Sequence, residues 1–108
     1  MSEYVLIESR DPFECAQVRD DWRLAEDLSA AGHRVALYLV QNGVLPARPG
    51  AQAPELAALS RAGVEVLADD FSLRERAIPA DRLAGGVEAA PIATLVDRLA
   101  AGCKALWL

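Results

Sequence analysis

The sequence predicts an α/β fold in which a mainly parallel sheet, of about five strands, is covered by helices on both faces. Short, continuous apolar runs alternate along the chain with segments that repeat apolar residues at helical spacing. Runs that are apolar throughout are typical of strands buried on both faces, and strands that alternate with helices are joined by right-handed crossovers. Because 108 residues leave room for one hydrophobic core, we expect a single domain over residues 1–108.

The first strand is predicted at Tyr4–Ile7, and a helix is expected to begin soon after it, at Asp11. Asp11 can cap a helix, Pro12 suits its first position, and Glu14 completes a capping-box pattern. The helix should end at Ala31-Gly32, since glycine tolerates the left-handed turn that closes a helix. Its apolar stripe comprises Val18, Trp22, Ala25 and Leu28.

The middle of the chain predicts two more strands with a helix between them. Arg34–Val40 is nearly all apolar, and Asn42-Gly43 should break this second strand. Residues 45–53 are rich in proline, glycine and alanine, which favours a loop. Pro54 should open a helix that buries Leu56 and Leu59 and closes at Ala62-Gly63, before a third strand at Val64–Ala68.

The last third of the chain predicts short elements and then a clear helix and strand. Ser72 to Glu75 forms a capping-box pattern for a short helix that Pro79 limits. A brief fourth strand is expected near Val87. Pro91 should begin the last helix, and a strand is predicted at Lys104–Leu108. The apolar residues of the last helix fall at helical spacing, at Ile92, Leu95, Val96 and Leu99.

Composition and charge narrow the class of partner. The net charge is −5, and no basic stripe interrupts the acidic balance, so nucleic acid and anionic membranes are poor partners. The longest apolar run, Val35–Val40, is too short to span a bilayer. No signal peptide is recognised at the N-terminus, so we expect a cytoplasmic protein. Aromatic residues make up 6% of a chain rich in alanine, which favours stabilisation by a partner subunit because little apolar area is buried per residue.

Few residues have the chemistry of a metal or cofactor site. One histidine, His33, and two distant cysteines, Cys15 and Cys103, are too few soft ligands for a usual zinc site, so no metal is expected. No phosphate-binding glycine motif occurs, and no nucleotide cofactor is expected. Cys103 and His33 should lie at the amino edge of the sheet. Cys103 is expected to serve in packing, and His33 should lie beside the end of a helix.

The site is expected at the carboxyl edge of the sheet, where parallel strands lead into their helices. Cys15 should lie there in the first turn of the first helix. The helix N-terminus favours a thiolate, although Asp11 and Glu14 oppose it. Cys15 is therefore interpreted either as a reactive thiol or as a small buried residue, since free cysteines often only fill space.

Other polar residues at this edge have alternative interpretations. Asn42-Gly43 could hold an anion with free amides or form an ordinary turn. Asp69 and Asp70 could bind a cation, but two carboxylates alone make a weak site, and Asp70 could simply cap the short helix. Arg74 and Arg76 could meet an anion or an acidic partner surface, or lie in solvent.

Two segments carry a resemblance to a known family. They are Leu39 to Val44, LVQNGV, and Ala62 to Ile78, AGVEVLADDFSLRERAI, and a C-terminal strand with Trp107 follows. Over nearly its whole length the chain resembles the DsrE/DsrF/DsrH family, which includes TusB, TusC and TusD. The resemblance implies a three-layer α/β/α fold, assembly into homo- or hetero-oligomers, and a role in intracellular sulfur transfer. Among the subgroups, the turn at residues 41–44 and Trp107 are most similar to DsrH/TusB.

The chain departs from the family at the sulfur-carrying position. Sulfur-carrying members hold a cysteine at the end of the third strand, where this chain has Val66 to Asp70, VLADD. Three hypotheses follow. The protein is a non-catalytic component of a sulfur relay that acts through contacts with itself or other relay proteins, or a persulfide carrier that uses Cys15. The third is a small-ligand or anion-binding module built on Asn42, Gly43 and Asp69.

Overall fold

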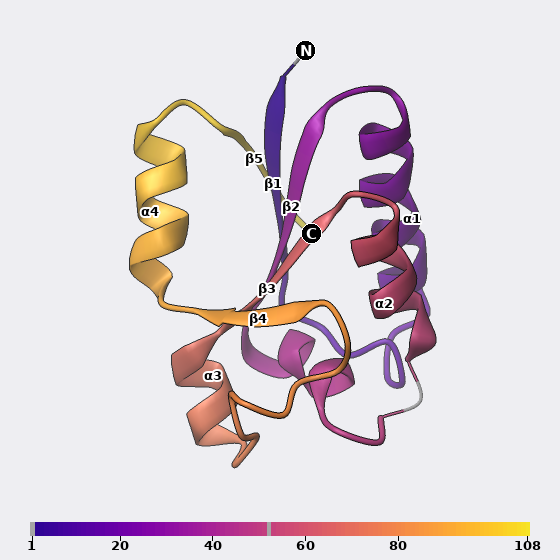
Figure 1. Cartoon of the computed structure of the whole chain (residues 1–108), viewed down its shortest axis with the longest axis vertical. Coiled ribbons are helices and arrows are strands. Elements are labelled where there is room, and N and C mark those ends of the chain that lie inside the picture. The colour runs from indigo at the N-terminus through magenta and orange to yellow at the C-terminus, as the bar shows by residue number, and fades with distance from the viewer. Residues whose placement is uncertain (1, 52) are drawn as a thin grey trace.

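The computed structural model describes residues 2–51 and 53–108. Within them the chain forms β1 (Glu3–Glu8), α1 (Gln17–Ala30), β2 (Arg34–Leu39), the 3-10 helix η1 (Gln41–Ala47), α2 (Pro54–Arg61), β3 (Glu65–Asp69), α3 (Asp70–Glu75), β4 (Val87–Ala90), α4 (Ile92–Ala100) and β5 (Lys104–Trp107). The strands pair in the order β4-β3-β2-β1-β5, and every neighbouring pair is parallel. Helices α1 and α2 cover one face of the sheet and α4 the other (Figure 1). The predicted three-layer α/β/α fold is confirmed.

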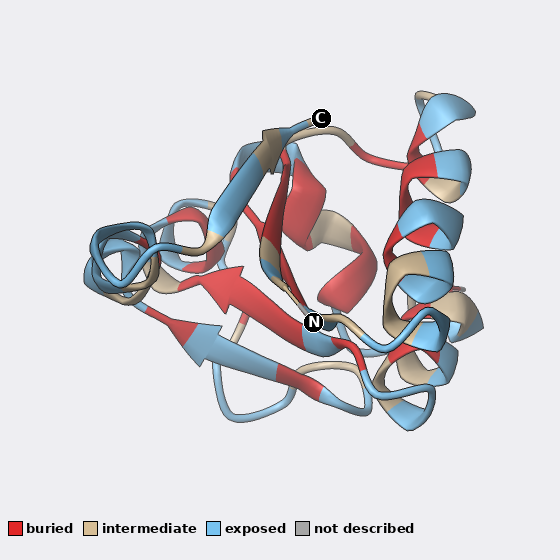
Figure 2. Ribbon diagram, turned by 90° about the horizontal axis from the view of Figure 1, so that it is seen from above, coloured by how far each residue is buried: buried red, intermediate tan, exposed pale blue. Residues whose placement is uncertain are grey.

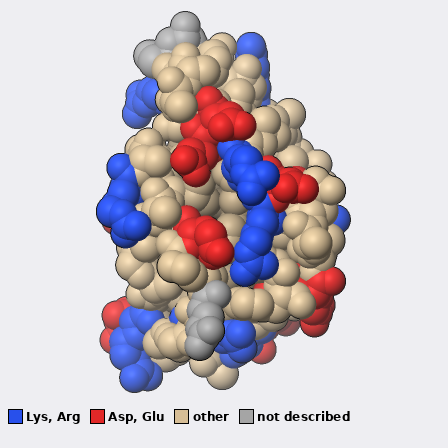
Figure 3. Space-filling view, turned by 90° about the vertical axis from the view of Figure 1, so that its right-hand side faces the viewer, with Lys and Arg blue, Asp and Glu red and all other residues tan. Residues whose placement is uncertain are grey.

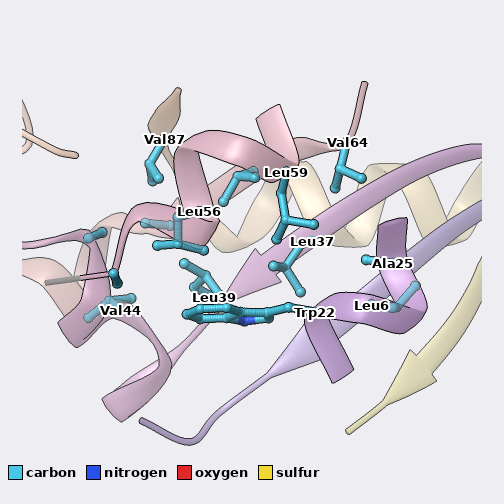
Figure 4. Close-up of a cluster of buried hydrophobic side chains, with 14 of the residues drawn as sticks. Leu6, Trp22, Ala25, Leu37, Leu39, Val44, Leu56, Leu59, Val64 and Val87 are labelled. Carbon is cyan, nitrogen blue, oxygen red and sulfur yellow. The ribbon is translucent and has the colours of Figure 1, made fainter. Parts of the chain in front are cut away.

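The larger core lies between the sheet and helices α1 and α2. Trp22 of α1 and Leu56 and Leu59 of α2 meet the inward side chains of the central strands, among them Leu37 and Leu39 (Figure 4). The apolar stripes predicted for the two helices therefore form this core, with Leu28 partly buried at its margin. Buried residues concentrate on the central strands, whereas β5, the strand that leads to the C-terminus, is mostly exposed (Figure 2).

The second core, under α4, is smaller. It joins Leu95 to residues of β1 to β4 and to Val40, which directly follows β2; these are Val5, Ile7, Ala36, Tyr38, Val40, Leu67 and Ala90. Leu95 is the buried residue of α4. The other three members of its predicted apolar stripe are exposed: Ile92 by 52%, Val96 by 57% and Leu99 by 41%.

The first helix begins later than predicted. Helix α1 starts at Gln17, and Asp11 instead closes a separate turn. The Asp11 carbonyl accepts hydrogen bonds from the amides of Glu14 and Cys15, and its Oδ1 accepts one from the Phe13 amide. Because Asp11 satisfies these donors within one turn, the turn closes on itself and does not continue into α1. Cys15 therefore precedes α1 and does not lie in its first turn.

Two further boundaries differ from the prediction. The segment expected to be a loop at residues 45–53 begins inside η1, which carries the chain directly out of β2. Gln52 of this segment lies outside the described residues. Helix α3 is capped by Asp69 and not by Ser72 or Asp70, because Asp69 Oδ2 accepts from the Ser72 amide at 3.0 Å. The other strands and helices agree with their predicted positions to within two residues.

Helix η1 crosses the end of β1 with a close backbone contact. A Cβ atom added at Gly43 would lie 2.2 Å from the carbonyl oxygen of Glu8, which is backbone and cannot rotate away. The same carbonyl accepts a hydrogen bond from the Val40 amide at 3.0 Å. Glycine at this position is therefore a packing requirement of the junction between β1 and η1.

Gly43→Ala is expected to lower the free energy of unfolding by about 2 kcal/mol, because the added methyl must push the two backbones apart. Urea denaturation followed by circular dichroism measures the change. Gly85→Ala is the matched control, since a Cβ there meets nothing within 4 Å. Equal stability of the two variants would contradict this account of the junction.

Candidate functional site

The carboxyl ends of the parallel strands lie at one edge of the sheet, at the lower side of Figure 1. The loop after β1, helix η1 and helix α3 leave the sheet there, as parallel pairing requires. Cys15, Asn42 and Asp69 therefore belong to segments of the same edge, as predicted. The hydrogen bonds nevertheless divide the edge into two clusters.

The first cluster surrounds Arg10, which lies between three acidic groups. Arg10 Nη1 lies 3.4 Å from Cys15 Sγ, and Arg10 Nη2 donates to Asp21 Oδ2 at 3.1 Å. Arg10 Nε lies 3.6 Å from Glu8 Oε2, and the Arg10 amide donates to the same oxygen at 3.3 Å. We call Glu8, Arg10, Cys15 and Asp21 the Arg10 cluster.

Glu8 is the most unusual member of the Arg10 cluster. It is the last residue of β1 and is 0% exposed, and its Oε1 has no hydrogen-bond donor among the described residues. Burial and, after it, the neighbouring Asp21 raise the pKa of Glu8 to about 7, although Arg10 acts in the opposite direction. Near neutral pH Glu8 therefore carries a proton for part of the time.

Arg10 keeps its charge in this environment. Burial opposes the charge, but Cys15, Glu8 and Asp21 together raise the pKa of Arg10. Its guanidinium is thus a fixed positive charge in contact with a half-buried thiol. A positive neighbour of this kind is one of the features that stabilise a thiolate.

The sequence contained a weak signal for two members of this cluster. Glu8 directly follows the predicted strand Tyr4–Ile7, and Asp21 stands beside Trp22 on the inner side of α1. The sequence alone assigned no role to Glu8, Asp21 or Arg10. The contact of Arg10 with Glu8 and Asp21 depends on the position of α1 over β1. The spacing of residues in the sequence does not specify this position.

The second cluster connects η1 and α3 and is internally satisfied. Asp69 Oδ1 accepts from the Tyr38 hydroxyl at 3.1 Å, and Asp69 Oδ2 accepts from the Ser72 hydroxyl at 2.7 Å. Asn42 Oδ1 accepts from Arg76 Nε at 3.2 Å and from Nη2 at 3.0 Å. Asp69 is therefore a buried helix cap and Arg76 holds η1 to α3, so neither is free for a ligand.

The remaining predicted site residues also have structural partners. The Gly43 amide donates to the Val40 carbonyl at 2.8 Å and is not available to hold an anion. Asp70 and Arg74 form an ion pair along α3 at 3.5 Å. They line a cleft of about 450 Å³ between α3 and Pro91. The geometry thus favours the Arg10 cluster over the anion or cation sites considered from sequence.

The amino edge of the sheet holds a second cleft, of about 700 Å³, lined in part by His33 and Cys103. His33 Nδ1 accepts from the Ser2 amide, and its ring packs edge-on against Tyr4. Cys103 Sγ donates to Glu3 at 3.4 Å, and burial together with Glu3 raises the pKa of the Cys103 thiol. The environment of Cys103 therefore disfavours its thiolate form.

Across residues 2–51 and 53–108, no three His, Cys, Asp or Glu side chains come together in a way that could hold a metal ion. In the same part of the chain, no helix has the length and apolar character needed to cross a membrane.

Two solved structures share the fold. The ychN protein from E. coli aligns with a TM-score of 0.89 at 20% identity over 100% of both chains. A protein of unknown function, MTH1491 from Methanobacterium thermoautotrophicum, aligns with a TM-score of 0.84 at 20% identity over 99% of this chain and 100% of that chain. No protein-family model and no curated protein sequence matches the chain. At this level of identity the two neighbours establish the three-layer fold.

The raised pKa of Glu8 predicts a pH-dependent stability. Between its ordinary value of 4.5 and about 7 the folded protein keeps a proton that the unfolded chain has lost, so the free energy of unfolding falls as pH rises through this range. Glu8→Gln should remove the decline and stabilise the protein at pH 8 by up to about 3 kcal/mol. Urea denaturation, repeated at about one-unit intervals from pH 4 to pH 8, measures the free energy of unfolding of both proteins.

Glu14→Gln is the control for this prediction, because Glu14 is an exposed carboxylate of the same loop. The prediction fails if wild type and Glu8→Gln lose stability in parallel as pH rises.

Proposed function

We propose that the protein is a cytoplasmic, non-catalytic component of a sulfur-relay assembly and that it binds a chain of the same fold through α4 and β5. The observation that carries the proposal is the apolar surface that these two elements leave uncovered. It consists of Ile92, Val96 and Leu99 on α4 and Trp107 on β5, and we call it the α4/β5 surface. Trp107 is 70% exposed.

The α4/β5 surface belongs to one face of the sheet. Ala105 and Trp107 are in register with Val5 and Ile7 of β1, which belong to the core beneath α4. In parallel pairing, residues in register point to the same face. Trp107 and α4 are therefore on the same side, beside a sheet edge where β5 pairs with β1 alone.

The energetics favour covering this surface. Burying one large aliphatic side chain contributes about 1.5–3 kcal/mol. Four large apolar side chains beside an open strand edge are a common feature of protein-binding surfaces and otherwise a risk for aggregation. The best-matched occupant is a surface with the same composition, such as the α4/β5 surface of a second copy or of a homologous relay chain.

The opposite face of the molecule has a different character. Acidic and basic side chains alternate over α1 and α2 (Figure 3). Arg19 of α1 pairs with Glu55 of α2 at 3.4 Å, and Arg23 pairs with Asp20 along α1. Such paired charges keep this face hydrated, which favours the α4 side as the contact surface.

The end of β3 supports a non-catalytic role in the relay. The family resemblance implies a sulfur-carrying cysteine there, but Ala68 and Asp69 occupy the end of this strand. Asp69 is committed to capping α3 and to Tyr38. The residues that would present sulfur in a carrier instead stabilise the edge of the sheet.

Val96→Glu is expected to shift the protein from an oligomer towards the monomer, because it places a charge on the exposed apolar stripe of α4. Light scattering coupled to size exclusion at micromolar concentration measures the mass. Leu24→Glu is the matched control, since Leu24 is an exposed leucine on α1. A wild-type protein that is monomeric, alone and when mixed with relay proteins of the same fold, would refute the proposal.

A second function, a persulfide carrier that uses Cys15, is favoured by the contact of Arg10 with Cys15 Sγ. In this reaction the Cys15 thiolate attacks the outer sulfur of a donor persulfide. A new sulfur–sulfur bond forms at Cys15, the bond within the donor breaks, and the donor leaves as a thiolate. The Arg10 guanidinium would balance the negative charge at Cys15 before and after transfer.

Incubation with a low-molecular-weight persulfide should make the intact protein heavier by one sulfur atom at Cys15, as measured by mass spectrometry. Cys15→Ser should abolish the added mass and Cys103→Ser should leave it unchanged. An unmodified Cys15, or addition at Cys103 alone, would eliminate the carrier function and leave the assembly proposal intact.

A further inference from the structure

The Arg10 cluster contains one positive charge and three groups that can become negative. Arg10 is within hydrogen-bond reach of Asp21 and Cys15 and 3.6 Å from Glu8. A single guanidinium cannot fully balance three anions in a partly buried site. The charge states of Glu8, Asp21 and Cys15 therefore depend on one another.

We infer that Glu8 and Cys15 form one proton-linked unit, in which both share Arg10 and the proton on Glu8 determines how readily the Cys15 thiolate forms. The inference deepens the second function proposed above and rests on it for its biological use. Glu8 is a positioning residue here, because it acts on Cys15 through Arg10 and touches no substrate.

The geometry around Glu8 leaves few routes to neutralise it. Glu8 is fully buried, and its Oε1 has no donor among the described residues, whereas Oε2 faces Arg10. The charged groups that face it are Arg10 from its own loop and Asp21 from α1. Gly43 of helix η1 packs against the backbone carbonyl of Glu8. A carboxyl group in this position either holds a proton or takes a share of the charge of Arg10.

The two states of Glu8 have opposite effects on Cys15. When Glu8 is neutral, Arg10 has only Asp21 to balance, and its Nη1 supports a thiolate at Cys15. When Glu8 is ionised, it draws on the same guanidinium and adds a like charge nearby, so the thiolate is less favoured. Formation of the thiolate and retention of the Glu8 proton therefore support each other.

The consequence is a distinctive dependence of thiol reactivity on pH. A lone thiol gains reactivity tenfold for each pH unit until its thiolate is fully formed. In this protein the ionisation of Glu8 near neutral pH opposes that gain. The wild-type profile should therefore rise less steeply around pH 7 than that of an isolated thiol.

The test is the rate of alkylation of Cys15 by iodoacetamide, measured between about pH 5.5 and pH 9.5 at intervals of about half a pH unit. The thiolate attacks the methylene carbon and iodide leaves, so the assay needs neither a sulfur donor nor a partner chain. All proteins carry Cys103→Ser, which leaves Cys15 as the single thiol. Circular dichroism and thermal melts check that each variant is folded.

Glu8→Gln should restore the steep profile of a single group and raise the alkylation rate at pH 8 about threefold or more, because one negative charge near the thiolate is gone. Arg10→Gln should lower that rate by about threefold or more, because the thiolate loses its counter-charge. Glu88→Gln is the control, because Glu88 is an exposed carboxylate on β4, three strands away from β1 in the sheet, and this variant should reproduce the wild-type profile.

The inference is overturned if Glu8→Gln is folded and its profile coincides with that of wild type, or if the wild-type profile already has the slope of a lone thiol. The second result decides the matter even if Glu8→Gln does not fold. If the pH coupling is present but Cys15 accepts no sulfur from a persulfide, the carrier function fails and the proton linkage stands. If Cys15 accepts sulfur but the pH coupling is absent, the proton linkage fails and the carrier function stands.

Discussion

Parallel pairing of β1 with both β2 and β5 is the constraint on which the rest of the molecule depends. It requires every loop that follows a strand to leave at one edge, and it brings the end of β1 under η1. There the backbone of Gly43 lies against the Glu8 carbonyl. The Glu8 side chain is buried at this point, and its charged neighbours are Asp21 of α1 and Arg10. The unusual chemistry of this edge is a result of strand packing.

The same sheet has two unequal faces. Helices α1 and α2 bury a large core and present paired charges outward, whereas α4 buries Leu95 and leaves the rest of its apolar stripe exposed. The Arg10 cluster lies on the α1 side of β1, because Glu8 follows Leu6 in the alternation of the strand. A partner bound to the α4/β5 surface would therefore leave Cys15 on the other face of the sheet, and assembly and thiol chemistry could operate in the same protein.

The sequence predicted the fold well because its signals are local and repeated. Continuous apolar strands and helices bounded by glycine and proline define the order of the elements without tertiary information. The start of α1 was misjudged because Asp11 can cap either a helix or an isolated turn, and only the packing of the following residues decides between them. The Arg10 cluster lay beyond prediction for a related reason. Glu8 and Asp21 are ordinary charges in the sequence, and their burial depends on the crossing of α1 over β1.

The position of β5 also has a consequence for how the chain folds. Tyr4 lies beside Lys104 in the sheet, so the first and last strands are neighbours although almost the whole sequence separates them. Closing a loop of that length carries a large entropic penalty, which only the contacts formed afterwards can offset. Strand β5 is thus expected to dock after β1, β2 and β3 have paired. Until then one flank of β1 stays open, and β1 is the strand whose premature pairing with another molecule would most disturb folding.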